Sequence, residues 1–341
     1  RKSGMAITAL SGTTYRGKDD RMQRQNQIKP MVEAGVLAGI AIMFAFISAY
    51  LPVVGSFIHL IWPVPIILLG VRHDVKWSVM ATIVAGILIA ILLHPLHAVS
   101  VVVGFGLTGV TLGYALRQQF PPAKTLLWGS AAAMISTAAV ITIGMMVLGT
   151  NPIQLQQDAM GKAMGQAIDF YRQMGMKEED LRRTAQTMDS VMSMMKVVLP
   201  AGFALASVII AYINLAVAKR VLRKMGHFVE PFPPFRAWQM PKLSLYGFIV
   251  GVLAMYWGHT RELTLLYNTG ANLQMVATVF LIIQGLAVFY FLADKYNLSR
   301  IIRGIILFLV LTNGIMLQVI LFAGAFDMAF NYRAKQRDAA N

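Results

Sequence analysis

Residues 34–51 read AGVLAGIAIMFAFISAYL, a run of apolar and small side chains that carries no charge. A helix rises about 1.5 Å per residue, so a run of this length can span a hydrocarbon layer about 30 Å thick. A second apolar segment opens with WPVP (residues 62–65), and a cationic turn, VRHDVK (residues 71–76), separates it from a third apolar run. We therefore predict that residues 33–93 form helices embedded in a membrane.

Composition extends this prediction to the rest of the chain. Of 341 residues, 57% are hydrophobic and only 13% are charged, whereas a soluble domain carries about a quarter charged residues. The net charge of +15 would suggest a nucleic-acid partner in a soluble protein. Here the cations lie almost wholly in loops, where they favour the cytoplasmic side and anionic lipid headgroups, so we expect no nucleic-acid partner. The chain has no cysteine, which excludes disulfides and cysteine metal ligands.

The predicted fold is all-α, a polytopic transmembrane helical bundle of about nine spans with an extracytoplasmic helical hairpin. Prolines shorten the second span, and a proline-rich loop precedes the short seventh span. The nine spans are predicted at residues 33–51, 57–70, 76–93, 97–116, 125–149, 196–218, 243–258, 272–293 and 300–326.

The chain divides by composition into five parts. Residues 1–30 form a basic polar tail that lacks the apolar core of a secretory signal, and we expect this tail to be disordered. A block of five spans (residues 31–150) precedes an amphipathic helical hairpin (residues 151–195), in which apolar residues recur at spacings of three and four. A second block of four spans (residues 196–330) and a polar tail (residues 331–341) complete the chain.

The distribution of cations predicts the orientation in the membrane. The short turns at residues 52–56 and 93–98 contain no Lys or Arg, as the positive-inside rule requires of outer turns. With an odd number of spans, we predict a multi-pass protein of the bacterial cytoplasmic (inner) membrane, with its N-terminus in the cytoplasm and its C-terminus outside.

The opening stretch resembles a known family. Its motifs, EAGVLAGIA (residues 33–41), PVVG (residues 52–55) and WPVPI (residues 62–66), are similar to the N-terminal pattern of the YybS family of uncharacterised bacterial membrane proteins, a resemblance that covers residues 30–330. More distantly, the first five spans are similar to S components, the substrate-binding subunits of energy-coupling-factor transporters.

The similarity to S components implies a docking face on the first span. In S components, small residues four apart on this span pack against a transmembrane coupling subunit, and the ligand is held from the outer side. Carried over here, the docking face would be Ala34 and Ala38, with Gly35 and Gly39 beside them. Small residues at this spacing let two helix backbones approach closely in lipid, and the same face can instead pack against helices of this chain.

Three histidines are candidates for a metal site at the outer face. His59 begins the second span, and His94 and His97 bracket the turn after the third span. Imidazoles bind divalent metals when neutral and can bind a carboxylate when protonated. Neither short outer turn contains an acidic residue, and a histidine at a membrane interface can simply present its polar tip to water.

The spans contain almost no ionisable side chains, although ion-coupled carriers commonly use them. Gln284 and Asn313, from the eighth and ninth spans, are candidates for a neutral ligand-binding pocket, and both can also serve as interhelical hydrogen-bond partners. The chain contains no glycine-rich phosphate loop, HExxH motif or paired acid cluster. We therefore expect no enzymatic activity, no catalytic residue and no bound cofactor.

Two hypotheses about function follow. The first is an S-component-like subunit that binds a small molecule for uptake, with a coupling subunit and ATPases supplied by other chains. The second is a membrane scaffold or assembly subunit of a larger envelope protein complex that binds other membrane proteins and carries no ligand. The methionines of the hairpin and the aromatic loop at residues 227–241 suit the second hypothesis, because such side chains adapt to protein partners.

Overall fold

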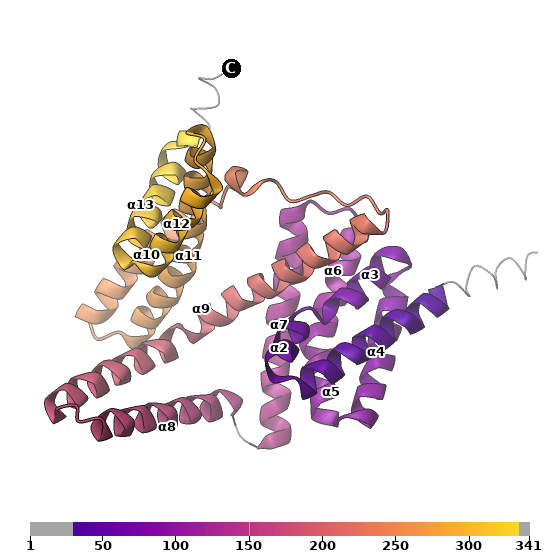
Figure 1. Cartoon of the computed structure of the whole chain (residues 1–341), viewed down its shortest axis with the longest axis horizontal. Coiled ribbons are helices and arrows are strands. Elements are labelled where there is room, and N and C mark those ends of the chain that lie inside the picture. Colours follow the sequence, from indigo (N-terminus) through magenta and orange to yellow (C-terminus); the bar gives the residue numbers. More distant parts are fainter. Residues whose placement is uncertain (1–29, 150, 334–341) are drawn as a thin grey trace, which may run out of the picture. The chain divides into compact units, whose positions relative to one another are not determined.

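The computed structural model describes residues 30–149 and 151–333, and the regular elements within these residues are all helices (Figure 1). The predicted all-α class is confirmed. Among the described residues, seven helices are long and apolar enough to cross a membrane, or eight if one sharply bent pair counts as a single span. Residues 1–29 and 334–341, which make up nearly all of the two predicted tails, lie outside the described residues.

The chain forms two compact units. Unit 1 contains the chain up to Gln154 together with Ala206–Pro231, and unit 2 contains Leu155–Leu205 and the chain from Phe232 onward. One helix, α9 (Glu178–Lys224), is shared, because its first part belongs to unit 2 and its second part to unit 1.

Unit 1 is built from helices that often begin at proline. Proline is tolerated in the first turn, where its missing N–H would have no helical partner. The elements of unit 1, besides its part of α9, are the first helix (Pro30–Tyr50), α2 (Pro52–Leu60), α3 (Pro63–Arg72), α4 (Val75–Leu92), α5 (Pro95–Val101), the π-helix η1 (Val102–Gly106), α6 (Leu107–Arg117) and α7 (Pro122–Leu148).

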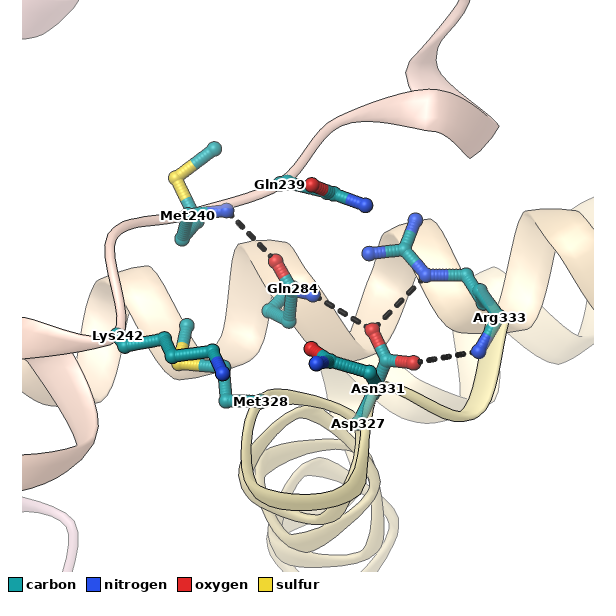
Figure 2. Close-up of a pocket in the computed structure, with 8 residues that line it drawn as sticks. All are labelled: Gln239, Met240, Lys242, Gln284, Asp327, Met328, Asn331 and Arg333. Atoms are coloured by element: carbon teal, nitrogen blue, oxygen red, sulfur yellow. Dashed lines mark hydrogen bonds and ion pairs between the residues drawn. The ribbon is translucent and has the colours of Figure 1, made fainter. Parts of the chain in front are cut away.

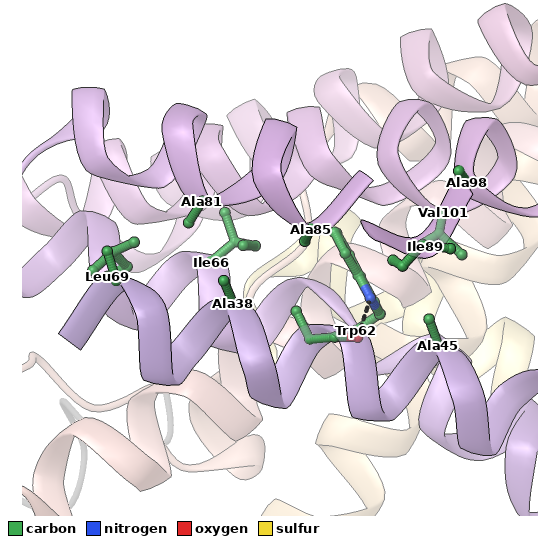
Figure 3. Close-up of a cluster of buried hydrophobic side chains, with 12 residues drawn as sticks. Ala38, Ala45, Trp62, Ile66, Leu69, Ala81, Ala85, Ile89, Ala98 and Val101 are labelled. Atoms are coloured by element: carbon green, nitrogen blue, oxygen red, sulfur yellow. Dashed lines mark hydrogen bonds between the residues drawn. The ribbon is translucent and has the colours of Figure 1, made fainter. Parts of the chain in front are cut away.

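The core of unit 1 lies along an alanine face of the first helix. Figure 3 shows Ala38 and Ala45 of this helix facing Trp62 and its buried neighbours. Alanines four residues apart allow the close approach, and the indole N–H of Trp62 donates to the carbonyl oxygen of Ala41 at 2.8 Å. The first helix is therefore held mainly by the two halves of the second predicted span and by α4.

That second span is broken where α2 ends and α3 begins. A backbone carbonyl left unpaired in hydrocarbon costs several kcal/mol, so a break is tolerated only if other groups satisfy it. Asn214 of α9 donates its side-chain N–H to the carbonyl oxygen of Leu60 at 2.8 Å. Beyond the break, Ser78 of α4 donates its hydroxyl to the carbonyl oxygen of Ile66 at 3.0 Å, which links α4 to α3.

Unit 2 contains a bundle in which α11 is the central helix. Gly285 of α11 and Gly324 of α13 mark a very close crossing, because a Cβ at either glycine would collide with a backbone carbonyl of the other helix. The elements after the shared helix are η2 (Phe235–Ala237), α10 (Leu243–Thr260), α11 (Thr264–Lys295), α12 (Arg300–Thr312) and α13 (Gly314–Phe330).

The ninth predicted span is not one straight helix. Its two halves, α12 and α13, meet at an angle of 104°. Asn313 lies between them in an extended conformation, and its side-chain oxygen accepts the backbone N–H groups of Ile315 at 2.9 Å and Met316 at 3.3 Å. The seventh predicted span is the 18-residue helix α10, which is not among the seven long apolar helices. About nine spans were predicted, and the part of the chain that the structure describes holds seven or eight candidate spans.

The predicted hairpin consists of α8 (Pro152–Gln173) and the first part of α9. Its second arm does not end before the sixth predicted span, because α9 continues for 47 residues through Pro200. A helix of that length extends for about 70 Å, more than twice the hydrocarbon thickness. Much of α9 must therefore project out of the membrane.

Asn272 of α11 repairs the helical hydrogen bonding near Pro200. Its side-chain oxygen accepts the backbone N–H of Ala201 at 2.8 Å, and its side-chain nitrogen donates to the carbonyl oxygen of Val197 at 2.7 Å. One carboxamide thus bridges the two backbone groups that an uninterrupted helix would pair with each other.

We predict that Asn272→Leu destabilises the protein, because it leaves both backbone groups without this partner at a cost of about 1–3 kcal/mol each. Denaturant unfolding in detergent micelles, followed by tryptophan fluorescence, measures the change. Asn268→Leu, one turn earlier on the same helix, is the matched control and should have a much smaller effect. Equal stability of the two variants would contradict the prediction.

Candidate functional site

Two of the three predicted histidines come together in unit 1. The ring centroids of His59 and His97 are 6.4 Å apart, and we refer to these two residues as the imidazole pair. Nδ1 of His59 lies 3.0 Å from the hydroxyl oxygen of Ser48. Phe105 of η1 packs its ring edge against His59 at a centroid distance of 4.7 Å. A π-helix often occurs at a functional site, and this one places an aromatic wall beside the pair.

His94 has a different role. It is exposed and accepts the backbone N–H of Leu96 on its own Nδ1 at 3.2 Å, which caps the start of α5. Within the described residues, no group of three or more His, Asp or Glu side chains is placed to hold a metal ion. The structure thus brings together two of the candidate metal ligands and does not gather a third, which a zinc site would need.

Unpaired polar atoms are buried in the same unit. Among the described residues, the buried side-chain atoms without a hydrogen-bond partner are Nε2 of His97, Oγ1 of Thr108, Oγ of Ser136 and Oδ1 of Asn214. Each such atom costs about 1–3 kcal/mol if it stays unpaired. Natural proteins rarely tolerate this, so each case calls for an explanation, such as an interaction with water or a ligand.

The small residues of the first helix divide between two faces. Ala34 and Ala38 are only 8% and 4% exposed and pack within the chain. Gly35 and Gly39 lie on the exposed face, and a Cβ added to either would meet nothing within 4 Å. The predicted docking face therefore splits, with its alanines in the core of unit 1 and its glycines on the surface.

Gln284 and Asn313 are not brought together. Gln284 accepts the backbone N–H of Met240 at 2.8 Å and donates to Asp327 at 2.6 Å (Figure 2). Asn313 caps the start of α13, whereas Asp327 lies near the end of α13. Nearly the whole helix, about 20 Å, therefore separates Asn313 from Asp327 and Gln284.

The network around Gln284 is buried and paired. Arg333 donates through Nε to Asp327 at 2.9 Å, and through its two terminal nitrogens to the carbonyl oxygens of Arg236 and Trp238 at 2.8 Å each. A cavity of about 70 Å³ lies beside these side chains. Ligand pockets are usually several hundred Å³, so this cavity suits a few water molecules and not a metabolite.

A larger groove lies between the two arms of the hairpin. Its volume is about 620 Å³, and α8 has no buried residue. Both apolar and charged side chains line it. The apolar lining residues include Met164, Ile168, Met188 and Met192, and the charged lining residues are Asp158, Lys162, Asp189 and Lys196. The methionine spacing in the sequence indicated an apolar face here, but not that the arms would leave a groove between them.

The fold defines the chain as a multi-pass α-helical membrane protein. Residues 39–328 match a family model described as "Predicted membrane protein (DUF2232)". This match covers most of the chain, so the protein belongs to that family. It is also 21% identical over 319 residues to the "Uncharacterized protein YybS" of Bacillus subtilis (strain 168), covering 91% of this chain and 99% of that protein. No solved structure matches.

These comparisons confirm the predicted resemblance to YybS. The more distant similarity to S components stays a prediction, as does the expectation that the chain is not an enzyme.

We predict that Arg333→Met lowers the free energy of unfolding by about 3–5 kcal/mol, because it leaves the buried carboxylate of Asp327 without its cation. Replacing both partners, in Arg333→Met with Asp327→Leu, should recover part of the loss, because no uncompensated charge is then buried. Denaturant unfolding in detergent micelles compares the variants. A double variant less stable than the single variant would contradict this account.

Proposed function

We propose that this protein is the ligand-binding membrane subunit of a multi-component importer. Unit 1 takes a small polar molecule from the outer side at the imidazole pair and docks a coupling subunit at Gly35 and Gly39. The chain carries no phosphate-binding loop, so separate ATPase chains supply the energy. The proposal takes up the predicted distant resemblance of the first five spans to S components.

The open glycine face is the observation that carries the proposal. Helices associate in lipid chiefly through close backbone contact at small residues, since lipid tails provide no hydrophobic driving force. Gly35 and Gly39 are one helical turn apart and exposed, and the space above them is open. Ala34 and Ala38, on the other face of the helix, pack in the core of unit 1. This packing fixes the rotation of the helix about its axis and keeps the two glycines on the surface.

The imidazole pair supplies the polar anchor for a ligand. Nε2 of His97 is buried without a partner, and the ring of Phe105 provides an apolar contact beside His59. Binding sites in proteins commonly combine apolar walls with a few such polar groups. Imidazoles donate or accept hydrogen bonds, or carry positive charge, so we propose a neutral or anionic small molecule.

The contacts at the start of the first helix support a cytoplasmic N-terminus. Glu33 pairs with Arg72 at 2.9 Å and with His73 at 2.7 Å, and Arg117 pairs with Asp74 at 3.2 Å. The start of the first helix thus shares one end of unit 1 with two cation-bearing turns. The positive-inside rule favours the cytoplasm for that end, in keeping with an inner-membrane location.

The scaffold hypothesis has its own supporting observation. The hairpin has an unfilled groove and an arm, α8, with no buried residue, which suits contact with another protein. In that case the copurifying proteins would be envelope or secretion components, and no small molecule would accompany them.

We predict that Gly35→Leu with Gly39→Leu abolishes copurification of a coupling subunit, because two bulky side chains keep the partner backbone away. Mass spectrometry of the gently solubilised complex measures the loss. Gly304→Leu is the matched control, since Gly304 is also exposed on an apolar helix with nothing within 4 Å. Unaltered copurification of the coupling subunit with the double variant would contradict the docking proposal.

We predict that a small molecule copurifies in stoichiometric amount and is lost in His59→Phe and in His97→Phe, because each change removes a polar anchor. Native mass spectrometry detects the bound molecule. His94→Phe should retain it, because His94 is exposed and caps its own helix. Loss in all three variants, or in His94→Phe alone, would exclude the imidazole pair as the site.

A further inference from the structure

Both ends of the bent pair α12–α13 meet the same small group of residues. At the start of α12, Arg303 forms an ion pair with Asp294, which is near the end of α11. The same guanidinium donates to the carbonyl oxygens of Leu298 at 2.9 Å and Ala293 at 3.1 Å. The start of α12 is therefore fixed at the C-terminal end of α11.

The chain just after α13 returns to this place. Arg333 donates to the carbonyl oxygens of Arg236 and Trp238 at 2.8 Å each. Arg236 in turn pairs with Asp294 at 2.7 Å, the carboxylate that also binds Arg303. One chain of contacts thus connects the start of α12 with the end of α13.

This arrangement is incompatible with a single membrane crossing. The two ends of a crossing segment lie about 30 Å apart, whereas here direct contacts through four residues, Arg303, Asp294, Arg236 and Arg333, connect them. The two helices have 13 and 17 residues, about 20 Å and 25 Å, so each is short for a complete span. Figure 1 shows the end of α13 at the same end of unit 2 as η2.

We infer that α12–α13 is a re-entrant helix pair that enters the membrane, turns at Asn313 and leaves on the side from which it came. Irregular backbone at membrane depth needs its polar groups satisfied. The side chain of Asn313 does this for the first N–H groups of α13, those of Ile315 and Met316. The end of α13 then lies on the same side of the membrane as the loop that holds Arg236.

Charge identifies that side as the cytoplasm. At the opposite end of unit 2, the short turn between α10 and α11 carries one cation, Arg261, beside Glu262, and the hairpin arms carry six cations and six acidic residues. The loop and turn that hold both termini of the pair carry six cations against two acidic residues, Asp294 and Asp327, and such an excess of Lys and Arg in short loops marks the cytoplasmic side. The cations at this end are Arg236, Lys242, Lys295, Arg300, Arg303 and Arg333.

The inference departs from the orientation predicted from the sequence, which placed the C-terminus outside. That prediction counted residues 300–326 as one apolar crossing. Hydropathy measures the length of an apolar run and does not detect a reversal inside it.

The buried ion pair of Asp327 and Arg333 secures the returning end. Asp327 is 4% exposed and Arg333 is 2% exposed. Gln284 donates to the carboxylate at 2.6 Å from α11. The end of α13 is thereby tied to the C-terminal half of α11 and to the loop before α10, which keeps the pair folded back on its own side.

The natural absence of cysteine allows a direct test. We expect Asn331→Cys, at the end of α13, to react with a membrane-impermeant maleimide in inverted vesicles and not in intact cells. Arg300→Cys, at the start of α12, should behave in the same way, and Arg261→Cys should show the opposite pattern. Labelling of Asn331→Cys in intact cells, together with Arg261→Cys, would overturn the inference.

A crosslinking experiment tests the same inference through proximity. Gln239 and Asn331 line one cavity (Figure 2), so Gln239→Cys with Asn331→Cys should be joined by a short bismaleimide. The matched pair, Gln239→Cys with Arg261→Cys, should not be joined. Absence of a crosslink in the first pair, in protein that remains folded by its tryptophan fluorescence, would contradict the return of α13.

Discussion

Hydrocarbon offers no hydrogen-bond partner to the backbone, and this constraint governs how the chain can interrupt its helices. Three interruptions stand out, and a neutral side-chain amide serves each of them. Asn214 serves the break between α2 and α3, Asn272 bridges backbone groups next to Pro200, and Asn313 caps the tip of the re-entrant pair. Amides can both donate and accept without the cost of burying a charge, which suits a chain whose spans contain few ionisable residues.

The polar groups that neither serve a break nor hold helices together are the ones available for function. The imidazole pair leaves Nε2 of His97 unpaired, whereas Gln284 and Arg333 are occupied in holding α13. The surface shows a similar division, since the first helix places its alanines in the core and leaves Gly35 and Gly39 open. The proposed ligand site and docking face are therefore features that the packing of unit 1 does not itself require.

Apolar run length and composition were sufficient to predict the all-α membrane fold, and short motifs were sufficient to indicate the YybS resemblance. The breaks were harder to locate. The bend at Asn313 had a local signal, an Asn-Gly pair, which a long apolar run obscured. The bond between Asn272 and Ala201 joins residues 71 positions apart, so no local pattern reveals it. Likewise, Ala34 and Gly35 are neighbours in the sequence, and only tertiary packing decides which of them faces the core.

The central claim is that side-chain amides replace missing helical hydrogen bonds within this membrane protein. Solid-state nuclear magnetic resonance in lipid bilayers, with isotope labels in asparagine side chains and valine carbonyls, tests it at Asn272. The account predicts a strong dipolar contact between the side-chain nitrogen of Asn272 and the carbonyl of Val197, consistent with their 2.7 Å hydrogen bond. A missing contact, with the Val197 carbonyl paired elsewhere, would contradict it.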